Sequence, residues 1–388
     1  MNKKIVISVN TAWNICNFRS GLVRALTRHG YDVVVMARND EYTPRLSALG
    51  CRVKLLSMDS NGTSPGRDLA LLVKYRRVLQ SVRPLAYLGY TIKPNVYGSI
   101  AANGLSIPVI NNIAGLGATF INSSMLTLLV KRLYQYSLRN SSRIFFQNAE
   151  DRNLFLRAGL GREQVMEVLP GSGIDLQHFQ PVQLPPLPRR PFRFLLVARM
   201  LKDKGIEEYV AAAELVRRHG LDAEFQLLGA VDANNPNAIP LERILAWQQR
   251  GLVRYLGKTD DVRPYLADAD CIVLPSYREG VPHCLLEAAA MARPIVATDV
   301  AGCKDAVDNG RNGLLCKVED ASDLARKMIQ MTGLTPAQRA EMGAWGRNKM
   351  TAQFDENIVI NKYLGAIEQI ELATRDHARN TLAPVAIL

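Results

Sequence analysis

The chain has 388 residues, more than one hydrophobic core usually covers, so we expect two domains. Hydrophobic residues make up 48% of the chain and charged residues 22%, which excludes an extensively disordered protein. No stretch approaches the roughly 18 consecutive apolar residues that cross a bilayer, and residues 1–9 hold too few apolar side chains for a secretory signal. We therefore expect a cytoplasmic protein.

The excess of positive charge lies entirely in the first half of the chain. Residues 1–180 contain 22 Lys and Arg against 10 Asp and Glu, whereas the remaining residues contain 26 of each. Such an asymmetry predicts an anionic partner for the N-terminal half. Composition alone leaves nucleic acid, an anionic membrane surface and a phosphorylated substrate open.

Six cysteines are scattered along the chain, with no close pair and no spacing typical of metal ligands. Most lie in apolar stretches, so we expect reduced thiols in the core. They are Cys16, Cys51, Cys271, Cys284, Cys303 and Cys316.

Short β-branched runs alternate with helical segments in the first half, as in parallel βαβ units. A helix is expected around residues 19–29, ending at Gly30. The expected strands are 4–9, 32–37, 52–56, 86–89, 108–113, 143–147 and 165–169.

Five prolines between residues 181 and 191 predict a linker, because neither a helix nor a central strand tolerates them. Strand–helix alternation resumes after it, and a helix over about 355–373 is expected to pack back on the first domain. The predicted division is 1–180, linker 181–191, second domain 192–354 and tail 374–388. The strands expected in the second half are 194–197, 225–228, 253–256, 271–275, 295–298 and 313–316.

This pattern predicts an α/β protein with two Rossmann-like, doubly wound domains facing a central cleft. In such sheets, ligands bind outside the carboxyl ends of the strands, where helix N-termini point inward. Candidate site residues are therefore expected in the loops that directly follow strands.

The first candidate cluster follows the strand that ends at Val197. Arg199 and Lys204 lie in the loop before the next helix, and two cations there would suit a diphosphate. The alternative is a pair of solvated loop charges.

The second cluster follows the strand 271–275. Glu279 and Gly280 precede a helix that begins near His283, and Glu287 lies one turn into it. One carboxylate could accept hydrogen bonds from sugar hydroxyls and the other from a ribose diol, while the helix start favours an anion. The alternative, solvated glutamates, is disfavoured because the run 284–292 is otherwise apolar.

Glycines end two further strands of the second half. Gly229, and Gly257 with Lys258, are placed to form the floor of a nucleotide-base pocket.

The loop after the first strand carries Trp13, Asn14, Asn17 and Arg19. Such groups could hold an acceptor sugar, with Arg19 on its phosphate. A helix cap with a core tryptophan is an equally good interpretation.

Residues 125–139 predict a basic amphipathic helix, with apolar positions 126, 129, 130, 133 and 136 or 137. Such a helix either lies on an anionic membrane or covers the sheet. Together with the charge of this half, it favours peripheral association with the inner face of the cytoplasmic membrane.

The motifs together resemble glycosyltransferase family 4. The resemblance rests on the spacing from Glu279 to Glu287, the Pro-Ser-x-x-Glu-Gly lead-in, Arg199 with Lys204-Gly205, and Asn312-Gly313. It covers nearly the whole chain and implies the GT-B fold, retention of anomeric configuration and no metal ion or other cofactor.

Four further segments are similar to a bacterial branch of that family. This branch extends undecaprenyl-diphosphate-linked sugars in O-antigen, capsule or N-linked glycan assembly, and includes an N-acetylgalactosaminyltransferase that acts on lipid-linked diacetylbacillosamine. The resemblance thus implies a UDP-sugar donor and a lipid-diphosphate sugar acceptor. The segments are 111–117, 146–151, 170–175 and 275–280.

The resemblance also implies roles in donor binding. Arg199 and Lys204 would bind the donor diphosphate, Glu279 the donor sugar and Glu287 the ribose. The leaving diphosphate would help to deprotonate the acceptor in a front-face substitution. Backbone N–H groups of His283, Cys284 and Leu285 would bind the distal phosphate.

Family members often place a histidine near the acceptor, but the segment 109–117 has none. Asn112 is the candidate replacement, beside Gly115 and Gly117.

Other classes fit less well. A GT-B epimerase would need further acid–base groups, and a phosphorylase a cofactor lysine. A nucleotide- or nucleic-acid-binding module would show stacking aromatics among basic residues, and an NAD enzyme G-x-G-x-x-G after a first strand. None of these patterns is evident, so no nucleic-acid partner is expected.

Overall fold

A computed structural model describes residues 3–58, 64–115, 125–183, 191–232 and 235–382, with only the backbone described for 125–129 and 377–382. The chain divides into two compact units. Unit 1 comprises residues 1–172 and 357–388, and unit 2 comprises residues 173–356. Each unit is a parallel sheet between helices, and the predicted cleft stays a prediction.

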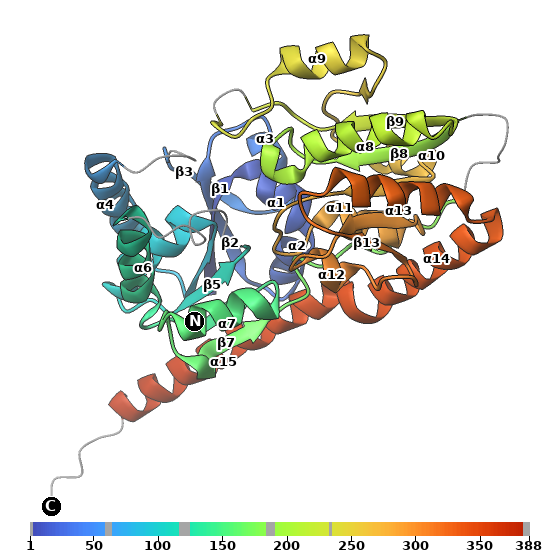
Figure 1. Ribbon diagram of the computed structural model, residues 1–388. Helices are drawn as coiled ribbons and strands as arrows, with labels where there is room; N and C mark the ends of the chain where they lie inside the picture. The colour runs from blue at the N-terminus through green and yellow to red at the C-terminus, as the bar shows by residue number, and fades with distance from the viewer. Residues whose placement is uncertain (1–2, 59–63, 116–124, 184–190, 233–234, 383–388) are drawn as a thin grey trace, which may run out of the picture. The chain divides into compact units, whose positions relative to one another are not determined.

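Unit 1 contains a seven-stranded parallel sheet in the order β3-β2-β1-β4-β5-β6-β7 (Figure 1). The strand order reverses between β1 and β4, which are paired in register from Ile5 opposite Ala86 to Ser8 opposite Gly89. This reversal is the switch point of the unit, where the loops after two neighbouring strands diverge to opposite faces. The strands are β1 (Lys4–Thr11), β2 (Asp32–Arg38), β3 (Arg52–Leu55), β4 (Ala86–Tyr90), β5 (Val109–Ile113), β6 (Arg143–Phe146) and β7 (Met166–Val168).

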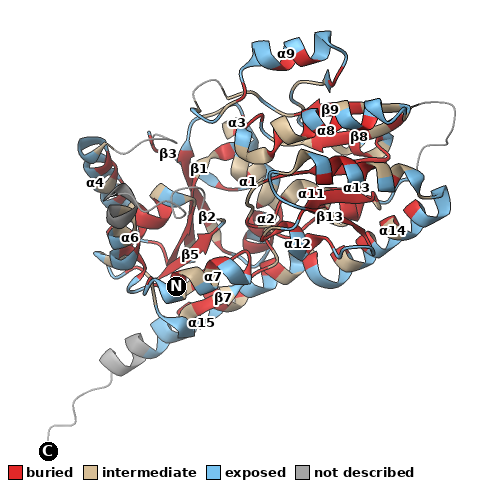
Figure 2. Cartoon of the chain, viewed as in Figure 1, coloured by how far each residue is buried: buried red, intermediate tan, exposed pale blue. Residues whose placement is uncertain are grey.

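Successive side chains along each strand of unit 1 point to opposite faces of the sheet, and a different set of helices covers each face. Ile5 and Ile7 pack under α1 (Ala12–Phe18), α2 (Ser20–Arg28), α3 (Thr43–Ala48) and α15 (Glu356–Leu382), whereas Val6 faces the other side. Both faces of the central strands β1, β2, β4 and β5 are buried, so these strands are largely apolar runs, whereas the edge strand β3 is mostly exposed (Figure 2). The second face carries α4 (Pro65–Val82), the π-helix η1 (Pro94–Gly98), α5 (Ser99–Asn103), α6 (Met125–Leu138) and α7 (Ala149–Arg157), and the 3₁₀ turn η3 (Glu163–Val165) precedes β7.

Unit 2 repeats the plan with six parallel strands in the order β10-β9-β8-β11-β12-β13. Its switch point lies between β8 and β11, where Cys271 pairs with Phe194 and Ile272 with Leu195. All thirteen predicted strands are confirmed. The strands are β8 (Phe192–Val197), β9 (Ala223–Leu228), β10 (Arg254–Tyr255), β11 (Cys271–Leu274), β12 (Ile295–Thr298) and β13 (Gly313–Cys316).

Helices cover both faces of this second sheet. Phe194 and Leu196 face α8 (Ile206–Arg218), α9 (Leu241–Gln249) and α13 (Ala321–Gly333), while Leu195 and Ile272 face the other side. That side carries α10 (Arg263–Asp268), α11 (His283–Ala290) and α12 (Cys303–Ala306), with the π-helix η5 (Met350–Phe354). The 3₁₀ turn η4 (Lys202–Lys204) precedes α8, and α14 (Pro336–Lys349) packs on α11 through Gly343 and Gly346.

The predicted boundary at residue 180 is wrong, because unit 2 begins at Gly173. Arg347 binds the segment that follows, donating hydrogen bonds to the Phe179 carbonyl at 2.6 Å and the Leu176 carbonyl at 3.0 Å. The buried Arg293 donates to the carbonyls of Val182 and Gln183. These long-range bonds fix residues 173–183 to unit 2. Residues 184–190 of the predicted linker lie outside the described part.

The C-terminal helix is also longer than predicted. We expected a helix over about 355–373 and a tail from 374, but α15 continues to Leu382. Residues 366–382 contain no glycine or proline, and Arg375 pairs with Glu371 one turn earlier at 2.7 Å. Tyr363 and Ile367 anchor the helix in the core of unit 1.

Of the predicted apolar face of α6, Val130 and Leu133 pack against the core and Ser137 is buried, as expected, whereas the alternative Tyr136 is not. The side chains at positions 126 and 129 lie outside the described part. Tyr134 and Leu138 point into the core, where Tyr134 packs against Phe155, whereas Tyr136 is 64% exposed. The described part of α6 therefore covers the sheet. Its exposed side carries Arg132 and Tyr136, and the exposed Arg139 follows its last residue. Within the described ranges, no helix combines the length and apolarity needed to span a bilayer.

Candidate active site

Two charged side chains meet at the switch point of unit 2. Lys204 lies in the turn after β8 and Glu279 in the loop after β11, and Lys204 Nζ is 2.5 Å from Glu279 Oε1. Their side chains are 16% and 15% exposed. An ion pair that is this buried depends on the fold rather than on chance proximity, since each partner compensates the desolvation of the other.

Backbone contacts hold the two loops together. Gly205 has a φ of +70°, and a Cβ there would lie 2.1 Å from the Pro275 carbonyl oxygen, so only glycine fits. The Asp203 carbonyl accepts hydrogen bonds from the Tyr277 amide at 2.9 Å and the Ser276 hydroxyl at 3.0 Å. The position of Lys204 relative to Glu279 is therefore fixed by the main chain.

The loop that carries Glu279 is supported from its other side by β12 and the segment after it. The buried Thr298 hydroxyl donates to the Ser276 carbonyl at 2.5 Å. Gly302, at a φ of +76°, approaches so closely that a Cβ would lie 2.0 Å from the Gly280 carbonyl oxygen. The loop containing Glu279 and Gly280 is thus clamped between two neighbouring loops.

Helix α11 begins at His283, as predicted, and presents Glu287 one turn later. His283 Nδ1 lies 2.8 Å from Glu287 Oε1, and both side chains are about 15% exposed, at 16% and 14%. The Glu287 carboxylate is therefore largely buried and fixed by its contact with His283, and it is not a solvated surface group. His283 is placed to orient it.

One backbone N–H that was predicted to bind phosphate already donates a hydrogen bond within the protein. The Leu285 N–H donates to the Pro282 carbonyl at 3.0 Å, and the Leu285 side chain is fully buried. Leu285 is therefore a core residue with its amide engaged in the first turn, which corrects its predicted role. Phosphate binding by the amides of His283 and Cys284 stays a prediction.

Cys284 lies close enough to Glu279 and Glu287 to be affected by both charges. Burial raises the pKa of its thiol, and the charges of Glu279 and Glu287 raise it further. The same causes, burial first and then Glu279, raise the pKa of Cys303. Both thiols stay protonated at neutral pH and are unsuited to nucleophilic catalysis. All six cysteines are free, and four of them are buried.

Arg199 occupies the exposed end of the same loop. Its guanidinium is close enough to Lys204 to lower the pKa of that lysine, although burial and Glu279 act more strongly. In the described part of the chain, Arg199 has no hydrogen bond or ion pair from its side chain, so it is available to a ligand. Lys204 and Arg199 thus form a pair of adjacent cations, one buried and one exposed.

The glycines at the ends of β9 and β10 also come together. The Gly229 amide donates to the Gly257 carbonyl at 2.8 Å, and a Cβ on Gly229 would lie 1.8 Å from the Ala198 carbonyl oxygen. They border the loop of Arg199, and Lys258 is exposed beside them. Tyr255, which the motifs did not indicate, donates its hydroxyl to the Gly229 carbonyl at 2.8 Å.

The predicted acceptor residues lie in unit 1. Asn112 is buried and donates through Nδ2 to the Tyr363 hydroxyl at 2.9 Å. Arg19 is buried on the ring of Tyr90, and Asn14 is half-buried in α1. Gly115 follows β5 with a φ of +107°, and Gly117 lies outside the described residues.

Trp13 is 42% exposed and packs edge-on against Phe18, so the interpretation as a core tryptophan is wrong. Asn17 donates to the Trp13 carbonyl at 2.9 Å and belongs to the same short helix.

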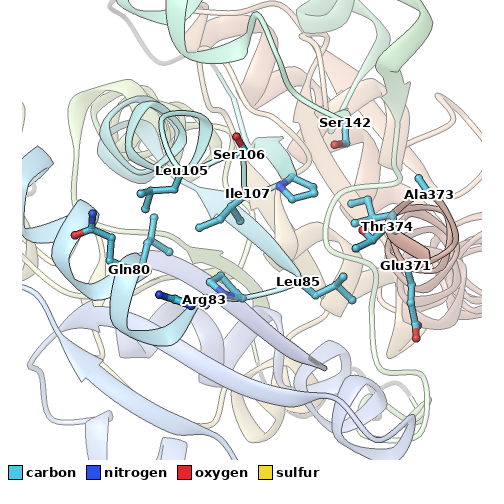
Figure 3. A pocket seen from close by; sticks show the side chains of 14 residues that line it. Gln80, Arg83, Leu85, Leu105, Ser106, Ile107, Ser142, Glu371, Ala373 and Thr374 are labelled. Atoms are coloured by element: carbon cyan, nitrogen blue, oxygen red, sulfur yellow. Dashed lines mark hydrogen bonds between the residues drawn. The ribbon is translucent and has the colours of Figure 1, made fainter. Parts of the chain in front are cut away.

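Figure 3 shows a pocket of about 920 Å³ in unit 1. It lies at the amino ends of β4 and β5, lined by Leu85, Ile107 and Pro108, with Arg83 and Glu371 at its sides. This edge is opposite to the carboxyl edge that carries Arg19 and Asn112. The pocket therefore contains none of the predicted site residues.

Two family models match the chain. Residues 18–171 match the model described as a glycosyl transferase 4-like domain, and residues 191–333 match glycosyl transferases group 1. Together with the two doubly wound sheets and the charged switch point, these matches define the class: the chain belongs to the GT-B glycosyltransferases of this family.

Two curated relatives resemble the chain over much of its length. The chain is 28% identical over 378 residues to an N,N'-diacetylbacillosaminyl-diphospho-undecaprenol alpha-1,3-N-acetylgalactosaminyltransferase of Campylobacter jejuni, covering 92% of this chain and 96% of the relative. It is 23% identical to a UDP-Gal:alpha-D-GlcNAc-diphosphoundecaprenol alpha-1,3-galactosyltransferase of Escherichia coli, covering 69% of this chain and 71% of the relative.

Solved structures share the fold. A sucrose-phosphate synthase from Thermosynechococcus elongatus matches with a TM-score of 0.79 and 19% identity, over 96% of this chain and 100% of that one. Anabaena HepE in complex with UDP-glucose matches with a TM-score of 0.75 and 17% identity, over 96% and 99%.

Replacing Glu279 with Gln is expected to lower the pKa of Lys204. Burial lowers that pKa, but Glu279, with a smaller contribution from Asp203, more than offsets burial in the intact site, so the wild-type pKa lies above its usual 10.5. Lys204 therefore stays charged through neutral pH and loses its contribution only as the pH rises past that raised value. Lysine side-chain NMR during a pH titration measures the change.

The matched control is Glu208→Gln, because Glu208 accepts a hydrogen bond from Tyr277 and not from Lys204. It should leave the Lys204 titration as in wild type. An identical titration of Lys204 in wild type and Glu279→Gln would contradict the ion pair.

Proposed function

We propose that this protein transfers an N-acetylhexosamine from a UDP-sugar to a polyprenyl-diphosphate-linked sugar. The reaction proceeds with retention and without a metal ion, at the inner face of the membrane, in the assembly of a bacterial surface or glycoprotein glycan. The observation that carries the proposal is the buried Lys204–Glu279 pair beside the start of α11. The relatives from Campylobacter jejuni and Escherichia coli, whose names state diphosphoundecaprenol-linked sugars, support the acceptor class.

The ion pair suits a site that exchanges partners when the donor binds. Without donor, Glu279 neutralises Lys204, so no lone buried cation is left in the loop. When a diphosphate arrives, Lys204 and Arg199 take its charge and Glu279 accepts hydrogen bonds from the donor sugar. The cations then stabilise the negative charge that develops on the leaving diphosphate.

Two features complete the donor site. His283 holds Glu287 at the first turn of α11, where the carboxylate would accept hydrogen bonds from the ribose diol. Gly229 lets the end of β9 approach the Ala198 carbonyl, and a Cβ on Gly257 would meet nothing within 4 Å, so we assign the base to the open space beside Gly257.

The positive groups replace a metal ion in this proposal. Among the described residues, no group of three or more His, Cys, Asp or Glu is arranged to hold a metal. Two cations and a helix N-terminus supply the charge that Mg²⁺ supplies elsewhere. No observation of the described residues favours the epimerase or the nucleotide- or nucleic-acid-binding alternative.

The surface of α4 supports attachment of unit 1 to an anionic membrane. Leu69 and Val73, one turn apart, are 63% and 42% exposed. Exposed basic residues lie around them on the same helix, and the helix's one acidic residue, Asp68, is buried in an ion pair with Lys93. An apolar pair among cations is complementary to an anionic bilayer surface. The basic residues are Arg67, Lys74, Arg76 and Arg77.

Substitution of the donor-site residues should slow transfer strongly. With a UDP-N-acetylhexosamine and a short-chain prenyl-diphosphate sugar, Lys204→Ala and Glu279→Ala should each reduce kcat/KM by a factor on the order of 10² to 10³. Mass spectrometry measures the product, and NMR of its new linkage should show the donor's anomeric configuration.

Lys202→Ala is the matched control, because Lys202 lies two residues before Lys204 with its side chain exposed. It should transfer at the wild-type rate. Transfer by Glu279→Ala at that rate, or a product of inverted configuration, would contradict the mechanism.

Binding to liposomes tests the membrane surface. The wild-type protein should bind vesicles that contain phosphatidylglycerol and dissociate from them at high salt, and it should not bind neutral vesicles. Charge reversal at Arg76 and Arg77 should weaken binding at least ten-fold. The control variant reverses the charge of two adjacent exposed arginines of α8 in unit 2, at positions 217 and 218. This variant should bind the vesicles as wild type does. Equal binding to neutral and anionic vesicles would exclude the proposed surface.

A further inference from the structure

The switch point of unit 1 contains a buried cation of its own. Arg19 lies between α1 and α2, after β1, and its side chain lies over Tyr90, the last residue of β4. The guanidinium carbon is 3.9 Å from the ring centroid, and the residue is only 7% exposed. Arg19 therefore spans β1 and β4 as the Lys204–Glu279 pair spans β8 and β11.

Arg19 differs from the other buried cations in lacking a compensating acceptor. Lys204 pairs with Glu279 and Lys93 with Asp68, and Arg293 donates to backbone carbonyls. For Arg19, no carboxylate or carbonyl of the described residues accepts a hydrogen bond from the guanidinium, and its Nε is buried without a partner. Stacking on Tyr90 offsets only part of the cost of burying a charge.

Further polar atoms without partners lie at the same edge of the sheet. Asn112, 2% exposed, uses one side of its amide for the Tyr363 hydroxyl and leaves Oδ1 without a partner. Whichever way this amide is turned, one polar atom stays available. Asn14 Oδ1 and Thr91 Oγ1 are also buried without partners. Asn112 lies near the carboxyl end of β5, and Asn14 and Thr91 follow β1 and β4, at the edge where doubly wound sheets bind ligands.

Tyr363 connects these groups. Its ring lies 6.0 Å from that of Tyr90, and Arg19 is close enough to oppose the rise that burial gives the pKa of Tyr363. Tyr363 belongs to α15, so the C-terminal helix supplies one wall of the same cluster. Arg19, Tyr90, Asn112 and Tyr363 are hereafter the Arg19 cluster.

We propose that the Arg19 cluster is a phosphate subsite, with Arg19 as the cation and the neighbouring amides as acceptors for sugar hydroxyl or acetamido groups. A guanidinium matches a phosphate with two parallel hydrogen bonds and stays charged at every physiological pH. The ligand class is a sugar linked to a phosphate. The phosphate is that of the diphosphate-linked acceptor, an assignment that rests on the proposed function.

A purely structural Arg19 would behave differently. If the stack on Tyr90 only stabilised the fold, removing the guanidinium would lower the melting temperature. An uncompensated buried cation held for a ligand does the opposite, because its removal also removes a desolvation cost. Arg19→Gln should therefore melt at or above the wild-type temperature, while losing anion binding.

Calorimetric titration of the full chain with inorganic pyrophosphate, in saturating UDP, tests the subsite. UDP occupies the donor site of unit 2, so a further pyrophosphate per chain reports unit 1. Arg19→Gln should weaken this binding at least ten-fold, and Arg19→Lys should retain part of it. The control Arg24→Gln removes an exposed arginine from the next turn of α2 and should bind as wild type. Pyrophosphate should raise the melting temperature of wild type but not of Arg19→Gln.

Each outcome separates the subsite from the proposed function. Unchanged pyrophosphate binding in Arg19→Gln, or a melting temperature lowered by several degrees, would overturn the subsite. A short-chain prenyl-diphosphate sugar should displace pyrophosphate from wild type, and failure to do so would overturn its assignment to the acceptor. Absence of UDP binding would count against the donor site and not against Arg19.

Discussion

A constraint of topology places the chemistry of this protein. In each unit the strand order reverses once, between β1 and β4 in unit 1 and between β8 and β11 in unit 2. At such a reversal the loops after two adjacent strands leave toward opposite faces of the sheet, so a space stays open between them. Lys204 and Glu279 meet across one reversal, and Arg19 and Tyr90 across the other. Charges that are distant in the sequence are thereby buried side by side.

Burying these charges costs stability, and the two units compensate for it differently. Unit 2 has a salt bridge at 2.5 Å, clamped by Gly205 and Gly302, where any side chain would collide with the main chain. Unit 1 has an aromatic ring beneath the cation and no carboxylate among the described residues. A compensated pair can exchange partners when a diphosphate arrives, whereas an uncompensated cation is already prepared for an anion.

Sequence reasoning predicted what local pattern determines. The strands were predicted because most parallel strands are buried apolar runs bounded by turns, and the positions of Lys204, Glu279 and Glu287 were predicted because their motifs follow such strands. The roles of these residues in donor binding stay a prediction. The failures depend on contacts distant in sequence. Arg347 holds residues 176–179 in unit 2, which moves the boundary away from the prolines. The exposure of Trp13 likewise follows from packing that periodicity does not contain. The bond from Leu285 to Pro282 is the exception, because it is a local bond in the first turn of α11. Tyr90 and Tyr363 carry no motif, and only the fold brings them to Arg19.

The central claim is that the nucleotide sugar binds at the switch point of unit 2, and hydrogen–deuterium exchange with and without UDP tests it most directly. The account predicts that the largest protection falls on the two loops at residues 198–205 and 276–287. The opposite edge of the sheet, at the amino ends of β8 and β11, should exchange its amide hydrogens at the same rate with and without UDP. Protection that is largest outside these two loops would contradict the account.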